Sequence, residues 1–180
     1  RIFYKNINLL KKEIKNKKKL ICIVKCPEIS FNSILTNSCH IISVLVYLFG
    51  NLRLEKKTKN KNFIICTFRS YRQDLITVYF NIKNSDNFSI EIFDKSKRYF
   101  LSPIEKLKIF KNLEKRKIFN NKVYIPKVFK EYDEIKISGR FKPGFNTQFK
   151  TFKSFNKSKK IFNDIFLAKK VMNICKEICK

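Results

Sequence analysis

Six cysteines and a single histidine are the residues of this sequence whose types and spacing could do chemistry. Cys22 and Cys26 are four positions apart, and so are Cys175 and Cys179, a separation that structural zinc sites use. The run around Cys22 has the pattern of a β-strand, however, in which residues four apart lie about 13 Å from each other. One metal ion cannot bind both. The sequence therefore predicts no metal site and favours buried free thiols in a reducing compartment.

Side chains suited to catalysis do not form a familiar pattern along the chain. The sequence contains no glycine-rich phosphate-binding loop and no nucleophile elbow. His40 lies in an apolar helical stretch without a nearby acid, which is typical of a structural histidine. The fourteen acidic residues are scattered rather than paired as acid–base work requires. We therefore expect no catalytic residues, no cofactor and no enzyme.

The charge balance points to a polyanionic partner instead. Forty-one Lys and Arg against fourteen Asp and Glu give a net charge of +27, although 44% of the residues are hydrophobic. Repulsion on this scale destabilises a compact chain, so such a domain usually lies against a polyanion. The excess of Lys, Asn, Ile and Phe is also what AT-rich codons produce, which makes the charge total more informative than any one lysine. The most apolar run, 41–49, is too short for a membrane helix, which takes about 20 residues.

Hydrophobic periodicity predicts a mixed order of helices and strands. Helices are expected over 2–16, over 30–49 with Gly50 as its stop signal, and over 161–179. Strands are expected at 20–26, 63–68, 75–82, 88–93, 122–125 and 134–138. The turn-forming residues Asn84–Asn87 predict that the third and fourth of these strands form a hairpin or meander.

The segment Ser102-Pro103-Ile104-Glu105 matches a capping box and predicts a helix over 103–113. Stretches rich in Lys and Asn at 55–62, 114–122 and 150–160 are expected to be linkers, and Lys142-Pro143-Gly144 a turn. The expected fold class is α+β, made of two small α/β subdomains. Residues 1–95 would form an N-terminal helix-strand-helix-hairpin unit, and residues 96–180 a short-stranded unit with a terminal helix.

This order of elements resembles the eighth small-subunit ribosomal protein family, in a diverged mitochondrial form. The matching segments, within residues 7–110, are 9–16 as the opening helix, 23–27 as the first strand, 38–52 as the second helix, 76–93 as the hairpin and 96–108 as the linker. The family's Ser-Thr-Ser-Lys-Gly string is absent, and Lys142–Thr147 is its nearest counterpart. Residues 135–140 also resemble a strand of the third small-subunit protein.

The resemblance implies a structural constituent of the mitochondrial small ribosomal subunit, located in the matrix, which binds ribosomal RNA and neighbouring ribosomal proteins and supports subunit assembly. It implies neither a small-molecule substrate nor a membrane. Basic residues would hold phosphates, and hydroxyls and amides would read the shallow RNA groove. The expected RNA contacts are Lys15, Lys17, Lys18, Lys19, Lys97, Arg98, Ser138, Arg140, Lys142, Asn146, Thr147 and Lys150.

Two alternatives stay open on the sequence. One is a basic accessory subunit of an organellar membrane complex that binds anionic lipid. The other is a different mitochondrial ribosomal protein, of the third small-subunit type or of the large subunit.

Overall fold

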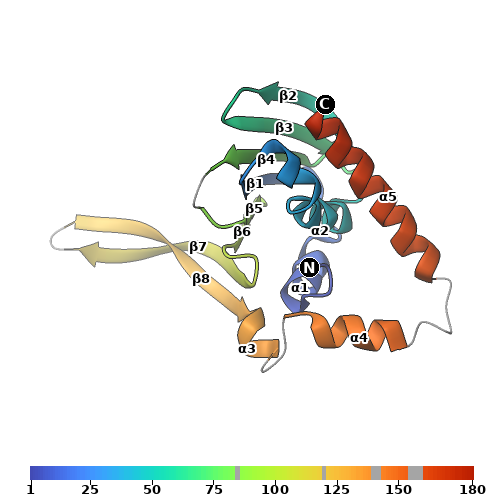
Figure 1. Ribbon diagram of the computed structural model, residues 1–180. Helices are drawn as coiled ribbons and strands as arrows, with labels where there is room; N and C mark the ends of the chain where they lie inside the picture. Colours follow the sequence, from blue (N-terminus) through green and yellow to red (C-terminus); the bar gives the residue numbers. More distant parts are fainter. Residues whose placement is uncertain (84–85, 119–120, 139–142, 154–159) are drawn as a thin grey trace.

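A single eight-stranded sheet forms the centre of the computed structural model, which describes residues 1–83, 86–118, 121–138, 143–153 and 160–180 (Figure 1). The strands are β1 (Ile21–Glu28), β2 (Leu52–Lys59), β3 (Phe63–Ser70), β4 (Leu75–Ile82), β5 (Ser89–Phe93), β6 (Lys97–Leu101), β7 (Lys106–Ile118) and β8 (Asn121–Asp133). The helices are α1 (Lys5–Ile14), η1 (Phe31–Leu35), α2 (Cys39–Phe49), α3 (Glu134–Ser138), α4 (Phe145–Lys153) and α5 (Lys160–Cys179). The strand order across the sheet is β2-β3-β4-β1-β5-β6-β7-β8.

The sheet is mixed, and β1 is its pivot. Strand β1 pairs parallel with β4 on one side and antiparallel with β5 on the other, and the remaining neighbours are antiparallel. The predicted hairpin between 75–82 and 88–93 is therefore wrong, because β1 lies between these two strands. Its alternating buried residues Cys22, Val24 and Cys26 give β1 the apolar face that a central strand needs.

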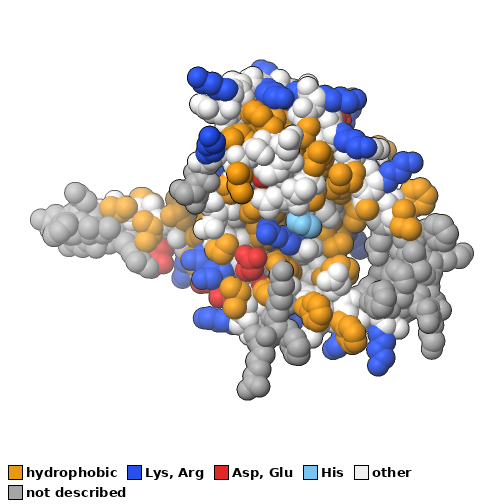
Figure 2. Space-filling model, in the orientation of Figure 1, with side chains coloured by type: hydrophobic (Ala, Val, Ile, Leu, Met, Phe, Trp, Pro, Cys, Tyr) orange, Lys and Arg blue, Asp and Glu red, His pale blue; other side chains and the backbone are white. Residues whose placement is uncertain are grey.

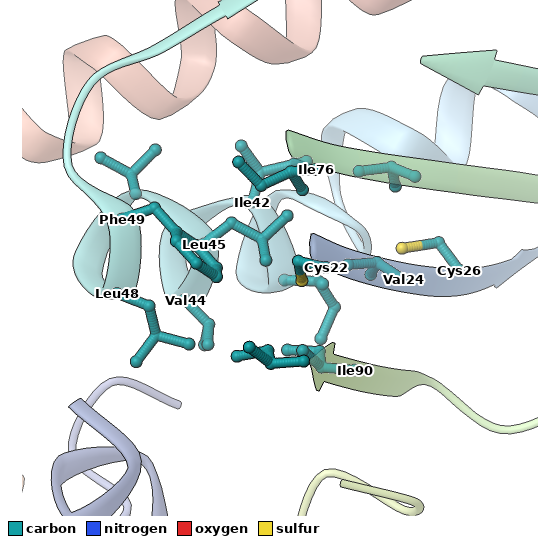
Figure 3. Packing of buried hydrophobic residues seen from close by; sticks show 14 of the residues in the cluster. Cys22, Val24, Cys26, Ile42, Val44, Leu45, Leu48, Phe49, Ile76 and Ile90 are labelled. Atoms are coloured by element: carbon teal, nitrogen blue, oxygen red, sulfur yellow. The ribbon is translucent and has the colours of Figure 1, made fainter. Parts of the chain in front are cut away.

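Helices cover one face of the sheet, with α1, α2 and α5 on the same side in Figure 1. Figure 3 shows side chains of α2, among them Ile42, Leu45 and Phe49, directed at Cys22 and Ile76 of the sheet. The strands alternate buried residues on this face with half-buried or exposed residues on the other, the pattern of a sheet whose two faces differ in environment. The hydrophobic core thus lies between the sheet and these helices.

The expected fold class of two small subdomains is wrong, since one sheet spans both halves of the chain. Strands β5 and β6 lie on either side of residue 95 and pair in register, with Ile92 opposite Tyr99. The buried cluster also joins residues from both halves, from Ile7 to Ile178. Continuous burial across the β5–β6 junction makes one core of the two expected ones.

The capping-box helix predicted at 103–113 is also wrong. Residues 102–106 form a turn in which the Lys106 N–H donates to the Pro103 carbonyl, and β7 begins at Lys106. Leu107 and Ile109 are buried while Lys106 and Lys108 are not, so the apolar period is two rather than 3.6. Pairing with β6 and β8 outweighs the local capping signal.

The other predicted elements divide in the same way. The helix at 161–179 is confirmed as α5, the helix at 2–16 is confirmed in shorter form as α1, and the helix at 30–49 is interrupted between η1 and α2. Gly50 ends α2 with φ 81°. The strands at 20–26, 63–68, 75–82, 88–93 and 122–125 are confirmed. Residues 134–138 form α3 instead of a strand, and most of the expected linker at 55–62 belongs to β2. None of the helices in the described ranges is long and apolar enough to cross a membrane.

Candidate functional site

The carboxyl end of β1 is the place where this sheet gathers polar side chains. Strands β1 and β4 run parallel and end side by side, with Glu28 opposite Ile82. The chain then turns through η1 into α2 (Figure 1). In open α/β sheets, ligands bind outside the carboxyl ends of such strands. We call the residues gathered here, Glu28, Ser33, Asn37, Ser38 and His40, the β1–α2 site.

Glu28 is the buried anion of this site, with 3% of its surface exposed. The hydroxyls of Ser33 and Ser38 donate to its two carboxylate oxygens, and the Asn37 amide donates to it at 3.4 Å. The carboxylate thereby lies near the amino end of α2, where a negative charge is favoured by the helix dipole. Its contacts fix the path of the chain from β1 into α2.

His40 lies in the first turn of α2 and is exposed, whereas the sequence pattern predicted a packed structural histidine. Its backbone N–H donates to the Asn37 carbonyl at 3.2 Å, which anchors the turn. Histidine is the side chain whose ordinary pKa allows proton exchange near neutral pH. At the adjacent Cys39, burial raises the pKa of the thiol, so this residue stays protonated and is a poor nucleophile.

The remaining cysteines are thiols packed in the core or beside it. Cys22, Cys26, Cys66 and Cys175 are buried and unbridged. Burial raises the pKa of Cys66 and of Cys175 to about 12. Within the described ranges, no three His, Cys, Asp or Glu residues group closely enough to hold a metal ion. These thiols are apolar packing groups.

The predicted RNA contacts near residues 15–19 and 97–98 do come together, but acids already engage several of them. Lys17 pairs with Asp94, and Arg98 pairs with Glu91. Lys97 Nζ lies 2.8 Å from Glu13 Oε2. Lys15, Lys18 and Lys19 are exposed. This cluster fastens the end of α1 to β5 and β6.

The second group of predicted contacts lies elsewhere. Arg140 and Lys142 are outside the described residues, and Ser138 is the last residue of α3. Asn146, Thr147 and Lys150 belong to α4, a helix rather than the expected loop. At the start of α4, Gly144 packs so closely on Tyr4 that an added Cβ would lie 2.8 Å from Tyr4 Cδ1. The start of α4 therefore adjoins the beginning of α1. The length of α1, about 15 Å, separates this point from the basic cluster that follows the end of α1.

The comparisons with known proteins place this fold among dehydrogenases. No family model matches the sequence, and no curated protein matches it. A dehydrogenase from Chromobacterium violaceum has a similar structure, with TM-score 0.69, 9% identity and coverage of 99% of this chain and 58% of its own. UDP-N-acetylglucosamine 3-dehydrogenase from Acidithiobacillus ferrooxidans gives TM-score 0.64 at 8% identity, covering 98% of this chain and 57% of its own.

Levoglucosan dehydrogenase, solved in complex with NADH and levoglucosan, gives TM-score 0.52 at 10% identity, covering 71% of this chain and 45% of its own. At such identities the likeness defines the fold alone. The class that it defines is the α/β fold found in dehydrogenases. The chain spans less than two thirds of each of these proteins.

The ribosomal interpretation is corrected by this result. The fold is not that of the eighth small-subunit family, and the structural neighbours are dehydrogenases and oxidoreductases. The expectations of a ribosomal role, of ribosomal RNA and ribosomal proteins as partners, and of a protein without enzymatic activity or small-molecule substrate are contradicted. The two alternatives, a lipid-binding accessory subunit and another ribosomal protein, gain no support. The matched segments were short. AT-rich codons enrich a chain in Lys, Ile and Phe, so short segments of it resemble those of a basic protein family through composition alone.

The β1–α2 site does not fit the phosphates of a dinucleotide such as NADH. Open α/β sheets hold pyrophosphate with a glycine-rich turn after the first strand. The whole sequence has three glycines, Gly50, Gly139 and Gly144, and none of them follows β1. The Glu28 carboxylate lies near the helix end where a pyrophosphate would be expected, and its charge has the wrong sign.

Sequence reasoning overlooked the β1–α2 site, although a signal was present. Glu28 follows directly after the apolar run of β1, and a segment rich in Ser and Asn separates it from the helix that carries His40. Polar residues at the end of a buried strand are a better guide to a site than the spacing of similar residues along the chain.

Proposed function

We propose that this chain is part of an oxidoreductase of the dehydrogenase type and that its β1–α2 site faces a hydroxylated small-molecule substrate. The observation that carries the proposal is the shared fold, which extends over 98–99% of the chain in two dehydrogenases. The second support is local to the site. In this chain the exposed His40 lies in the first turn of α2, which follows the carboxyl end of the parallel β1–β4 pair.

The chemistry that these residues can supply is proton transfer. Oxidation of an alcohol to a carbonyl removes a hydride from carbon and a proton from the hydroxyl. His40 is the residue of the site suited to taking that proton and to returning it in the reverse reaction. Glu28 acts as a positioning residue, because it holds Ser38 and Asn37 at the turn from which His40 emerges. The hydride would pass to an oxidised nicotinamide dinucleotide, the cofactor type in the levoglucosan dehydrogenase complex, held by residues other than those of the β1–α2 site.

Carbohydrates are the substrate class that the neighbours favour. Two of them are named for levoglucosan and UDP-N-acetylglucosamine, both of which carry sugar hydroxyl groups. The half-buried Asn37 amide contacts Glu28 through its nitrogen, and its oxygen is the kind of group that accepts a hydrogen bond from such a hydroxyl.

Substrate binding can be tested by nuclear magnetic resonance on the isotope-labelled protein. Levoglucosan, glucose and UDP-N-acetylglucosamine would be titrated while the His40 ring and the amides of 28–40 are observed. We expect saturable shifts centred on these residues for at least one sugar, and weaker binding by His40→Asn. Asn173→Ala, at an exposed position of α5, is the matched control. The absence of saturable shifts with every sugar, or shifts unaffected by His40→Asn, would contradict the proposal.

A further inference from the structure

A hollow lies at the end of the sheet opposite the β1–α2 site, where β2 begins and β3 ends. It has a volume of about 560 Å³ and is lined by Asn51, Arg53, Arg69, Ser70, Tyr71 and Gln73. The turn after β3 meets the beginning of β1, since the Leu20 N–H donates to Asp74 Oδ1 at 2.9 Å. The length of β1, about 25 Å, therefore separates this hollow from the β1–α2 site. We call it the Arg53–Arg69 hollow.

Two arginines lie directly opposite each other across the β2–β3 ladder. Arg53 of β2 is the register partner of Arg69 of β3. Like charges in directly opposed positions destabilise a sheet, so this pair needs a compensating anion. Glu55 supplies part of it: its Oε1 accepts from Arg69 Nε at 2.7 Å and from Arg53 Nη2 at 3.3 Å. Two guanidinium groups share one carboxylate oxygen, so the three side chains together keep one net positive charge. Most of the guanidinium N–H donors do not bond to Glu55.

The third feature of the hollow is Tyr71, which at 91% exposed has the highest fractional exposure among the large hydrophobic residues that the structure describes. It lies on a turn that is held firmly from both ends. The Ser70 N–H donates to the Asp74 carbonyl at 3.0 Å, and the Ser70 hydroxyl donates to Asp74 Oδ2 at 2.7 Å. The Asp74 carboxylate is buried and also accepts from Arg72 Nε at 3.1 Å. A rigid turn thus presents an aromatic ring to solvent beside two arginines.

We propose that the Arg53–Arg69 hollow binds a phosphate monoester attached to a ring. The two guanidinium groups grip the phosphate through charge-assisted hydrogen bonds, for which the planar fork of Arg is well suited. The negative charge of the phosphate more than neutralises the one positive charge that Glu55 leaves on the opposed arginines. The Tyr71 ring packs on the ring of the ligand, and the volume of the hollow suits a ligand of this size. This site does not depend on the function proposed for the β1–α2 site.

Titration calorimetry at constant ionic strength tests the site with two probes, inorganic phosphate and phenyl phosphate. The wild type should bind both, and phenyl phosphate more tightly. Arg53→Gln and Arg69→Gln should each weaken both probes about tenfold or more. Arg69→Lys keeps the charge and the strand but loses the fork, so it should also weaken both. Tyr71→Ala should remove the preference for phenyl phosphate and leave inorganic phosphate unchanged.

Lys61→Gln is the matched control, because it removes one exposed positive charge from the turn at the far end of the same β2–β3 pair. It should leave both affinities unchanged. Equal weakening by Lys61→Gln and by the arginine substitutions would show that phosphate responds only to the total charge of +27, and would overturn the proposal. So would the absence of saturable binding, or a preference for phenyl phosphate that survives Tyr71→Ala.

Discussion

At the scale of single residues, several of the few acids in this basic chain connect segments that are far apart in the sequence. Glu134 accepts from the Asn6 N–H at 3.0 Å and so caps the first turn of α1 from 128 residues away. Asp74 joins the β3–β4 turn to the start of β1, and Glu28 joins β1 to α2. A hydrogen bond to a buried carboxylate is stronger than one between neutral groups, so these acids define junctions that lysines cannot.

The Glu13–Lys97 pair makes a pH-dependent junction between α1 and β6. The hydrogen bond from Lys97, opposed by partial burial, lowers the pKa of Glu13 from its ordinary value of 4.5. The unfolded state therefore binds this proton first as the pH falls. The pair's stabilisation is complete above pH 4.5 and is lost as the pH falls through the lower folded pKa. Glu13→Gln should thus reduce the loss of unfolding free energy in this window, as measured by urea denaturation in steps of pH.

Glu177→Gln serves as the control, since Glu177 is exposed on α5. Its stability curve should run parallel to that of the wild type below pH 4.5. If the Glu13→Gln curve does the same, the pair does not contribute to stability and α1 is held to β6 by other contacts.

Residue type alone could predict the charge of the lysines but not their partners. Lys17 finds Asp94 across 77 positions, and Lys97 finds Glu13 across 84. Partners this far apart in the sequence produce no local pattern. The clustered cations by themselves therefore predict an RNA contact and not the ion pairs that the structure shows. His40 was likewise judged by its apolar neighbours in sequence, although those neighbours face the core while the ring is exposed.

At the scale of elements, burial on one face decides what could be predicted. Strands β3, β4 and β5 alternate strongly apolar residues with others, and the sequence located all three. Strand β2, Leu52–Lys59, is rich in lysine, and the sequence predicts a linker over 55–62 that overlaps most of it. Its register with β3 stabilises it, and lysines on an edge strand discourage pairing with other chains. Pairing of this kind has no signal in the strand's own residues.

Strand β7 offers a direct test of the burial pattern along it. Leu107 is fully buried near the start of β7, and Leu113 is 62% exposed farther along the same strand. Leu107→Ala should lower the free energy of unfolding by about 2–5 kcal/mol, because it leaves a cavity in the core. Leu113→Ala should change it by less than about 0.5 kcal/mol. Urea denaturation of both variants measures the difference, and equal effects would contradict the burial of Leu107 and the exposure of Leu113 described for β7.

At the scale of the whole molecule, the net charge of +27 destabilises the folded chain through repulsion and does not by itself identify a binding partner. Figure 2 shows Lys and Arg side chains spread over the visible face instead of gathered in one basic track. The ion pairs of the described residues engage only part of this charge. The protein is held together by one continuous core, from α1 to α5, against the repulsion of its surface.

Salt should therefore stabilise this protein. Two effects oppose each other when sodium chloride is raised from about 0.05 M to about 0.5 M, a range over which the Debye length falls well below 10 Å. Screening weakens the surface ion pairs, which contribute only about 0–1 kcal/mol each, and it weakens the repulsion among the many unpaired cations. Because the net charge is +27, the second effect is larger and the Tm should rise by several degrees, as measured by calorimetry.

A variant in which two exposed lysines of β8 are neutralised, Lys122→Gln with Lys127→Gln, should begin at a higher Tm and gain less from salt. A Tm that falls with salt would mean that the ion pairs, and not the repulsion, govern the stability of the folded chain.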